Sequence, residues 1–417
     1  MKDMKTTLGP KLRFPEFRGG GGWELKQLGD FLTESRLPGS KGDVAKKITV
    51  KLWGNGVFEK NEAIQGSVNT QYFQRKAGQF IYSKLDFLNQ AFGIVPASLN
   101  HFESTVDLPC FDIAEGLNSG FLLEYVKRKD FYARVGEAAD GSRKARRIHA
   151  ETFLSFSMGL PIPAEQQKIA DCLSSLDELI AAQARKVDVL KTHKKGLMQQ
   201  LFPREGETQP RLRFPEFRDA GEWESGLLGA IFGTTSGGTP NRSEASYWDG
   251  DIPWITTSLV NFEVIAGAEE YISQAGLKNS SAKLLPKGTV LIAMYGQGKT
   301  RGQVALLGVE ATTNQACAAV LPKEGINPYF VFSNLAGRYD EFRKLSNSGG
   351  QENLSQALIR DFPFSYPVDE MEQQRIADCL TSLDTLITAA TQELETLKTH
   401  KKGLMQQLFP SAEAVEA

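Results

Sequence analysis

The chain has little cysteine and little histidine, with four residues of each among 417. No Cys-x-x-Cys or His-x-x-His spacing occurs, which leaves a zinc site few ligands to draw on. A continuous apolar run of about 20 residues, the length needed to span a bilayer, is missing too. The formal net charge of −2 gives no hint of a nucleic-acid partner. These absences predict a cytoplasmic protein without disulfides, a bound metal or a membrane segment.

Two blocks of sequence occur twice, whereas the sequence between them does not repeat. The motif Leu-Arg-Phe-Pro-Glu-Phe-Arg at residues 12–18 returns 200 residues later, and Trp-Glu follows it in both copies. Residues 165–203 return 207 residues later as 372–410. Repeats of this size determine architecture. Blocks that stayed identical and blocks that diverged are therefore expected to perform different tasks.

Each copy of the long block predicts a helix with a coiled-coil seam. Apolar residues advance by four and three over ten positions, with prolines just before and just after the pattern. Each helix is then about 38 residues, or about 57 Å, long. The seam positions of the first copy are Ile169, Leu173, Leu176, Ile180, Gln183, Val187, Leu190, Lys194, Leu197 and Leu201, and their equivalents lie 207 residues later.

The apolar stripe on each helix needs a packing partner. The other copy is the obvious partner, and packing of each helix on its own globular neighbour is the alternative. The polar seam residues Gln183, Lys194 and Lys401 are expected near helix ends or crossing points, where they lose least hydration.

The two segments that lie between the repeated blocks predict two compact α+β domains. We expect one fold for both domains, with different surfaces. Strand-like runs at residues 79–83 and 289–294 lie among glycine and asparagine turns. The expected order is a conserved N-terminal segment (1–23), a first domain (24–162), a central long helix (163–203), a linker that repeats the N-terminal segment (204–223), a second domain (224–369), a C-terminal long helix (370–410) and a tail (411–417).

Motifs for catalysis are scarce. Residues 296–300, Gly-Gln-Gly-Lys-Thr, resemble the end of a phosphate-binding loop, but Ala293 stands where its first glycine belongs. A strand-like run follows, whereas that motif requires a helix. The segment is better interpreted as a projecting, positively charged loop, with a nucleotide-binding enzyme as the alternative. Cys110 follows a proline, as in a cytosine methyltransferase nucleophile, but without a glycine-rich cofactor loop it is expected in the core.

Two further segments suit nucleic acid. Residues 143–147 place four cations on an expected turn that opens into a helix, where backbone amides also bind phosphate. Residues 346–353 are the polar counterpart in the second domain, and asparagine and glutamine can read adenine edges. A solvated charge run and ordinary surface turns are the alternatives. The candidate DNA-contacting residues are Arg143, Lys144, Arg146, Arg147, Tyr295, Gln297, Lys299, Thr300, Arg301, Asn347 and Gln351.

Four features now identify a family. They are the repeated Leu-Arg-Phe-Pro-Glu-Phe motif with Trp-Glu, the Glu-Gln-Gln-(Lys/Arg)-Ile-Ala helix starts, the Lys-Lys-Gly-Leu-Met-Gln-Gln-Leu-Phe-Pro helix ends, and Ser-Gly-Gly-Thr-Pro at 236–240. Tyr-Trp at 247–248 and Ile-Pro-Trp at 252–254 accompany the last. On these motifs the chain resembles the DNA-specificity subunit of a type I restriction–modification system. The first domain lacks the Gly-Gly-Thr-Pro pattern.

The resemblance implies a fold and a set of partners. The expected fold is two α+β target-recognition domains, separated by two long helices that form an antiparallel coiled coil, with a pseudo-twofold internal repeat. Each domain would read one half of a split, asymmetric DNA site. Two copies of an adenine-N6 methyltransferase subunit would dock on this scaffold, and the restriction/translocase subunits would join them for cleavage. The chain itself would be non-catalytic, because S-adenosylmethionine, ATP and Mg²⁺ belong to the partners.

Residues identical in both helices but outside the seam predict a surface for the same partner bound twice, because a coiled coil constrains only its seam. Very recent duplication is the alternative, but it would have kept the two domains alike. A protein-binding scaffold that never touches DNA is a rival function. The candidate partner-binding residues are Lys191, Lys195, Gln199, Gln200, Lys398, Lys402, Gln406 and Gln407.

Overall fold

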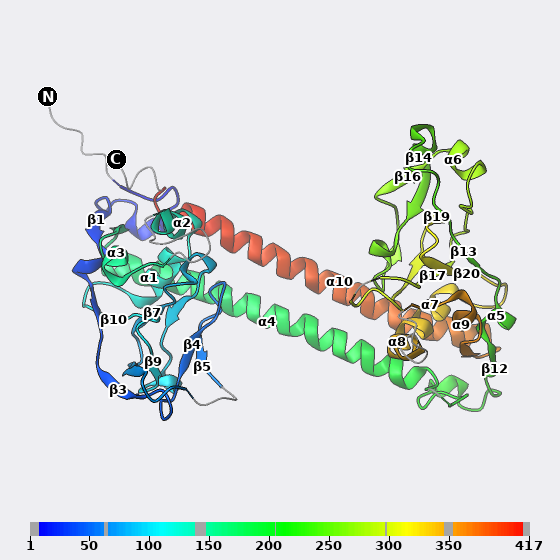
Figure 1. Cartoon of the computed structure of the whole chain (residues 1–417), viewed down its shortest axis with the longest axis horizontal. Helices are drawn as coiled ribbons and strands as arrows, with labels where there is room; N and C mark the ends of the chain where they lie inside the picture. The colour runs from blue at the N-terminus through cyan, green and yellow to red at the C-terminus, as the bar shows by residue number, and fades with distance from the viewer. Residues whose placement is uncertain are drawn as a thin grey trace. The chain divides into compact units, whose positions relative to one another are not determined.

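The computed structural model describes residues 8–61, 66–137, 147–204, 206–296, 298–345 and 353–411. The chain divides into two compact units. Unit 1 comprises Met1–Ala184 and Gln392–Ala417, and unit 2 comprises Arg185–Thr391. Each unit contains one globular domain and part of both long helices, α4 (Pro163–Leu201) and α10 (Glu370–Gln407), which Figure 1 draws as unbroken ribbons.

Within each unit the two long helices pack antiparallel. In unit 1, Lys401 of α10 lies 2.6 Å from the Asp177 carboxylate of α4. In unit 2, Lys194 of α4 lies 2.5 Å from the Asp384 carboxylate of α10. These two ion pairs are equivalents, 207 residues apart, with the roles of the helices exchanged. Every seam position is buried or partly buried in both copies, so the predicted seam is confirmed.

One polar seam residue, expected near a helix end or a crossing point, does not lie near an end. Gln183 lies in the middle of α4, and it is buried. Its amide donates a 2.8 Å hydrogen bond to the Glu393 carboxylate of α10, within unit 1. A hydrogen-bonded partner thus replaces the hydration that was expected to keep this side chain near a helix end.

Lys401 also reaches the globular domain of unit 1. Its ammonium lies 3.0 Å from the Glu124 carboxylate, and Lys127 lies 2.6 Å from the same side chain. Burial raises the pKa of Glu124, but the two ammonium groups outweigh burial and hold that pKa below its ordinary value. The starts of both helices pack on their own globular neighbours as well, since Leu173 of α4 lies in the unit 1 core and Leu380 of α10 in the unit 2 core. The two alternatives left open by the sequence therefore both occur.

The described residues of the unit 1 domain form short antiparallel sheets and three α-helices. A four-stranded sheet has the order β2 (Leu32–Glu34), β10 (Cys110–Ile113), β7 (Phe80–Tyr82), β8 (Phe92–Ile94). A second sheet joins β3 (Pro38–Lys41), β6 (Gln71–Gln74) and β9 (Glu103–Ser104), and β4 (Ile48–Val50) pairs with β5 (Val57–Glu59). The helices are α1 (Ser119–Val126), α2 (Lys129–Glu137) and α3 (Ala150–Leu154).

The domain of unit 2 contains a corresponding main sheet with a fifth strand, and two of its strand pairs are parallel. A five-stranded sheet has the order β13 (Thr234–Ser236), β20 (Cys317–Val320), β17 (Val290–Ala293), β18 (Val304–Leu307), β15 (Val264–Ile265). A three-stranded sheet has the order β16 (Glu270–Ile272), β14 (Trp248–Ile255), β19 (Thr312–Thr313). The helices are α5 (Leu228–Ile231), α6 (Gln274–Lys278), α7 (Pro328–Gly337), α8 (Tyr339–Leu345) and α9 (Gln356–Arg360).

In both domains the first strand pairs with the last. β1 (Glu24–Gln27) is antiparallel to β11 (Ser157–Leu160), and β12 (Glu224–Leu227) is antiparallel to β21 (Pro363–Tyr366). The strands expected at 79–83 and 289–294 are β7 and β17. Gly78 and Gly288, two residues ahead of those strands, both adopt a left-handed φ, of 85° and 88°. The two domains are therefore one fold built on divergent sequences.

The ends of the long repeats leave the helix and enter the domain cores. Phe409 packs against Trp23 in unit 1, with ring centroids 6.2 Å apart. Phe202 and Trp223 both pack on Phe330 in unit 2, at 5.3 and 5.7 Å. The identical Leu-Phe-Pro ends thus serve as core residues. None of the described helices is long and apolar enough to cross a membrane.

We predict that stability follows burial along α10. Leu380 is 0% exposed, so Leu380→Ala should cost about 2–5 kcal/mol, because it removes packed methyl groups and leaves a cavity. Leu386, on the same helix, is 54% exposed, so Leu386→Ala should change stability little. Urea unfolding followed by tryptophan fluorescence measures both variants. Equal losses would contradict the burial pattern.

Candidate nucleic-acid interface

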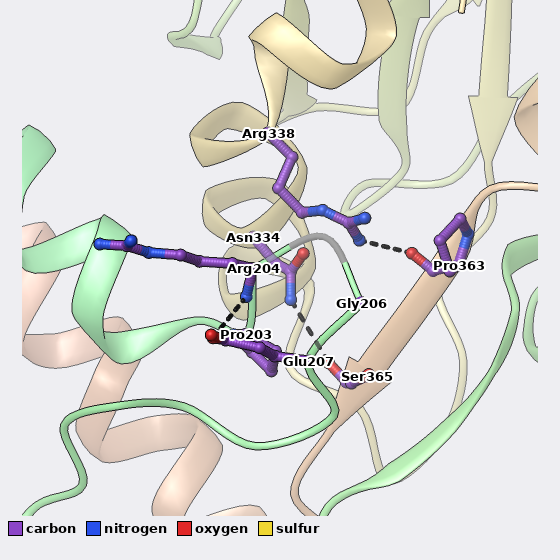
Figure 2. Close-up of a pocket in the computed structure, with 8 residues that line it drawn as sticks. All are labelled: Pro203, Arg204, Gly206, Glu207, Asn334, Arg338, Pro363 and Ser365. Atoms are coloured by element: carbon purple, nitrogen blue, oxygen red, sulfur yellow. Dashed lines mark hydrogen bonds between the residues drawn. The ribbon is translucent and has the colours of Figure 1, made fainter.

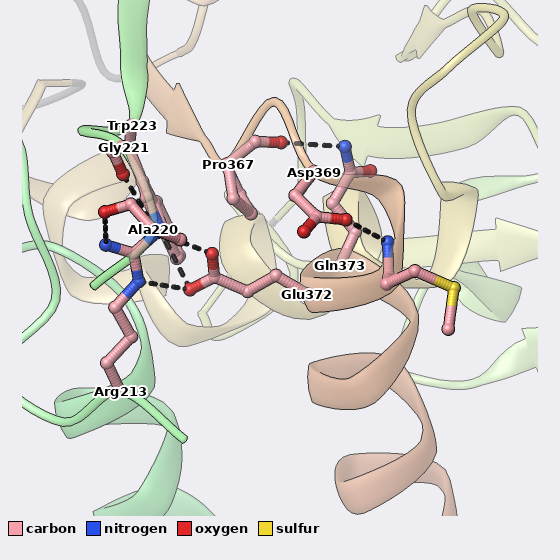
Figure 3. Close-up of polar contacts among 9 residues, drawn as sticks. Arg213, Ala220, Gly221, Trp223, Pro367, Asp369, Glu372 and Gln373 are labelled. Atoms are coloured by element: carbon pink, nitrogen blue, oxygen red, sulfur yellow. Dashed lines mark hydrogen bonds and ion pairs between the residues drawn. The ribbon is translucent and has the colours of Figure 1, made fainter. Parts of the chain in front are cut away.

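A buried ion pair joins the repeated motif of unit 2 to the start of α10 (Figure 3). Arg213 donates from Nε and Nη2 to the two oxygens of Glu372, at 2.7 and 2.6 Å. The Trp223 indole nitrogen donates to the same carboxylate at 3.2 Å. Arg213 also binds the Ala220 and Gly221 carbonyls, at 3.0 and 2.9 Å. We call this arrangement of arginine, tryptophan and glutamate the clamp.

Unit 1 contains the same clamp. Arg13 donates to both oxygens of Glu165, at 2.8 and 2.6 Å, and the Trp23 indole nitrogen donates at 3.3 Å. The glutamate side chain is only 1% exposed in each unit. The hydrogen bond to Glu165 raises the pKa of Arg13, and that to Glu372 raises the pKa of Arg213. Both glutamates lie in the first turn of a helix, where a carboxylate also stabilises the helix dipole.

The glutamine after each clamp glutamate ties the helix start to the domain. Gln166 accepts a hydrogen bond from the Asn118 amide at 2.8 Å and donates to the Gly116 and Pro161 carbonyls, both at 2.9 Å. Its equivalent Gln373 makes the corresponding bonds to Asn327, Gly325 and Pro367, at 2.7, 3.1 and 2.8 Å, the last visible in Figure 3. The need to satisfy a buried amide explains why both copies have a glutamine at this position.

The repeated motif also binds the end of a long helix. In unit 1 the Leu12 amide donates to the Gln407 carbonyl of α10, at 2.9 Å. In unit 2 the Leu212 amide donates to the Gln200 carbonyl of α4, also at 2.9 Å. The motif thus joins the start of one long helix to the end of the other within each unit. Because the motif is identical in both copies, the sequence predicted that it belongs to the shared scaffold. The residues that it contacts could not be predicted from the sequence.

The loop between β17 and β18 carries exposed side chains, and its backbone is held in the middle of the loop by α8. Tyr339 of α8 donates its hydroxyl to the Lys299 carbonyl at 2.6 Å, and Arg343 donates to the Gly298 carbonyl at 2.5 Å. The side chains of Tyr295 and Lys299 are exposed, whereas Thr300 and Arg301 are partly buried. A strand, β18, follows the loop, so the helix that a phosphate-binding loop requires does not follow it. The loop therefore fits the expected positively charged loop better than a nucleotide site.

Most of the other candidate DNA contacts cannot be placed. Arg147 is about half exposed, and its guanidinium lies 3.9 Å from the Asp107 carboxylate. Five candidates lie outside the described residues, namely Arg143, Lys144, Arg146, Asn347 and Gln351, and Gln297 of the loop does so too. Their contact with DNA stays a prediction.

The eight candidate partner-binding residues are all exposed. Because the long helices are antiparallel, each unit receives one set of four. Unit 1 carries Lys398, Lys402, Gln406 and Gln407 of α10, and unit 2 carries their equivalents Lys191, Lys195, Gln199 and Gln200 of α4.

Two exposed leucines at equivalent positions of the long helices were missed in the sequence. Leu179 of α4 and Leu386 of α10 are equivalents, 207 residues apart, and each is 54% exposed. Leu179 belongs to unit 1 and Leu386 to unit 2, so each unit also receives one leucine. The sequence could have indicated them, because a leucine occurs at this position in both copies although the position lies outside the seam. Exposed apolar side chains at repeated positions suit a protein partner.

A small cavity of about 30 Å³ lies beside β21 in unit 2 (Figure 2). Asn334 of α7 donates to the Ser365 carbonyl at 3.3 Å, and Arg338 donates to the Pro363 carbonyl at 2.5 Å. The volume is close to that of one water molecule, so the cavity does not fit a nucleotide.

Cys110 and Cys317 are buried core residues, as expected for Cys110. Burial raises the pKa of each thiol to about 12, which leaves too little thiolate for nucleophilic chemistry near neutral pH. Among the residues that the structure describes, no group of three or more His, Cys, Asp or Glu side chains is placed to hold a metal ion.

Comparison with known proteins agrees on one family. A family model for the type I restriction modification DNA specificity domain matches residues 220–399. The Escherichia coli specificity subunit of type I restriction enzyme EcoR124I/EcoR124II is 31% identical over 179 residues, which cover 42% of this chain and 44% of that protein. The Methanocaldococcus jannaschii MjaIX specificity subunit is 31% identical over 42% of this chain and 41% of its own length. These alignments span less than half of either relative.

Other similarities extend along the whole chain. The M. jannaschii MjaVIII specificity subunit is 22% identical over 95% of this chain and 93% of its own length. The crystal structure of the S subunit of a type I restriction–modification system from M. genitalium superimposes with a TM-score of 0.59 at 15% identity. That superposition covers 97% of this chain and 100% of the other. The fold class expected from the sequence is therefore confirmed.

We predict that the clamp of unit 2 is a major source of stability. Arg213→Ala should cost about 3–5 kcal/mol, because it leaves the buried Glu372 carboxylate without its cation. Arg211→Ala is the matched control, since Arg211 forms an exposed ion pair with Glu207 and its loss should change little. Urea unfolding compares the two variants. If Arg213→Ala were as stable as the control, the clamp would not have this role.

Proposed function

We propose that the chain is a specificity subunit of a type I restriction–modification system and that it selects the DNA sequence on which such a system acts. The chain is then non-catalytic and binds duplex DNA together with the other subunits of the complex. The observation that carries this proposal is the repeat itself: one clamped scaffold is built twice, and it holds two domains of the same fold with different surfaces.

The divergent domains support a bipartite DNA site. Each domain reads one half of an asymmetric sequence, because its sheets and loops carry different side chains on a common framework. In the second domain, Lys299 and Arg301 lie on the loop held by α8 and are the leading DNA contacts. In the first domain they are the cations at 143–147. The near-neutral charge of the chain implies that partner subunits supply much of the basic surface that binds phosphate.

The repeated helix surface supports two copies of a methyltransferase subunit. Unit 1 presents Leu179 with the lysines and glutamines of α10, and unit 2 presents Leu386 with those of α4. Identical side chains in both units suit the same adenine-N6 methyltransferase bound twice. The restriction/translocase subunits join the same assembly, which is cytoplasmic. S-adenosylmethionine, ATP and Mg²⁺ are bound by the partners rather than by this chain.

Methylation-sensitive sequencing of DNA from cells that carry the chain and its methyltransferase tests the function directly. We expect methylated adenines in one split, asymmetric sequence. In parallel, the purified complex should be retained on duplex DNA in a salt-dependent manner. A complex that methylates no defined sequence and is not retained on DNA would instead support a scaffold that binds only proteins.

Exchange of one domain tests whether each domain reads its own half of the DNA site. Replacing residues 224–369 with the equivalent domain of another specificity subunit should change one half of the methylated sequence and leave the other half unchanged. The reciprocal exchange of residues 24–162 is the control, and it should change the opposite half. A single exchange that altered both halves would contradict independent reading.

Substitution of the exposed leucines tests the partner surface. Leu179→Ser or Leu386→Ser should each remove one methyltransferase copy, and the double variant should remove both, because apolar anchors dominate such interfaces. Val189→Ser is the matched control, since Val189 is 66% exposed but its equivalent in α10 is Thr396. Native mass spectrometry counts the copies. Two copies bound to the double variant would place the interface elsewhere.

A further inference from the structure

The first domain presents an exposed tryptophan at the tip of the β4–β5 hairpin. Trp53 is 64% exposed, whereas Trp23, Trp223 and Trp254 are buried and Trp248 is partly covered. An indole in contact with water at a hairpin tip gains no packing that would explain its presence. A partner that covers it in the assembled complex would supply that packing.

The backbone of the turn makes tryptophan a costly choice. Residues 52–55 form a tight turn in which the Asn55 amide donates to the Leu52 carbonyl at 3.3 Å. The two central residues, Trp53 and Gly54, both have a left-handed φ, of 60° and 69°. Such turns favour asparagine, aspartate or glycine at the first central position, and a bulky residue there is strained. Strain of this kind concentrates at functional sites.

The turn is fixed to the domain, so it presents the indole in one place. The Trp53 amide donates to the Asn89 carbonyl at 2.7 Å, and the Gly54 amide donates to the Gln90 carbonyl at 2.9 Å. Gln90 itself adopts a left-handed φ of 55°. The hairpin tip is therefore tied to a second irregular segment by two backbone hydrogen bonds.

The neighbours of Trp53 suit a polyanion. Lys51 is exposed, and its ammonium lies 4.1 Å from the centre of the Phe58 ring. Lys127 also approaches the turn, since a Cβ on Gly54 would lie 3.3 Å from its Cε atom, but its ammonium is paired with Glu124. Lys51 is therefore the cation that the turn offers to a phosphate. An aromatic ring beside a lysine is the combination by which proteins stack on bases while they neutralise phosphates. A protein partner would gain less from an exposed lysine, since lysine is depleted at such interfaces.

We propose that Trp53 is a specificity-determining residue of the first domain, which wedges its indole against a base step of the first DNA half-site. Apolar wedges of this kind partly unstack a base step, and the energy that they cost depends on the sequence. Trp53 would thus contribute sequence preference without hydrogen bonds to base edges. This inference rests on the proposed function and names a contact that it leaves unassigned.

A substitution that separates stability from recognition tests the proposal. Trp53→Asn places a favoured residue in the turn, so the thermal midpoint of unfolding should stay the same or rise. The affinity of the complex with its methyltransferase for the target duplex should fall about tenfold, while affinity for a scrambled duplex stays unchanged. Trp53→Phe should retain most of the affinity. Val44→Ala, at another exposed apolar residue of the same domain, is the control without effect.

Fluorescence gives an independent measurement on the same complex. The difference in emission between the wild type and Trp53→Phe isolates Trp53, and acrylamide should quench that signal less once the target duplex is added. Two results would overturn this inference alone: a wild-type complex that prefers its target while Trp53→Asn binds equally well, or an equal loss on every duplex. A wild-type complex that binds no duplex would overturn the proposed function together with it.

Discussion

The buried pairing of an arginine with a glutamate at the start of each long helix is the interaction on which the rest of the architecture depends. The carboxylates of Glu165 and Glu372 lie almost fully out of water, where an unpaired charge is unstable. Two hydrogen bonds from one guanidinium and a third from an indole nitrogen satisfy each carboxylate. The clamp brings the repeated motif to the helix start and thereby sets where the first strand of each domain begins. That strand pairs with the last strand of the same domain and closes it.

Because the helices are antiparallel, a tandem repeat in sequence gives two units that each contain one motif, one helix start and one helix end. Unit 1 combines the first copy of the motif and of the helix start with the second copy of the helix end. Unit 2 combines the remaining three pieces. Ion pairs show the same exchange, since Lys401 meets Asp177 in one unit and Lys194 meets Asp384 in the other. Any partner that recognises a helix start together with a helix end therefore finds the same side chains in both units.

The loop and the turn that we propose as DNA contacts in the two domains share a construction, although their sequences differ. The loop after β17 is held by α8 through carbonyl contacts, and the β4–β5 turn is held by two amide donors. In both, the backbone is fixed while Lys299 or Trp53 remains exposed. A fixed backbone loses little conformational entropy on binding, so affinity depends more directly on side-chain chemistry. The domains can thus change what they contact without changing how the contact is held.

Repeats, helices and the seam could be predicted from the sequence because they depend on local periodicity and on identity between copies. The resemblance to a known family likewise rested on contiguous motifs. The partners of Arg13 and Gln183, by contrast, lie 152 and 210 residues away, and no local pattern names them. The left-handed backbone of Trp53 is a similar case, because propensity alone would place asparagine or glycine there. Only the tertiary structure could decide these features, since each depends on which distant atoms replace water around a buried charge, a buried amide or a strained turn.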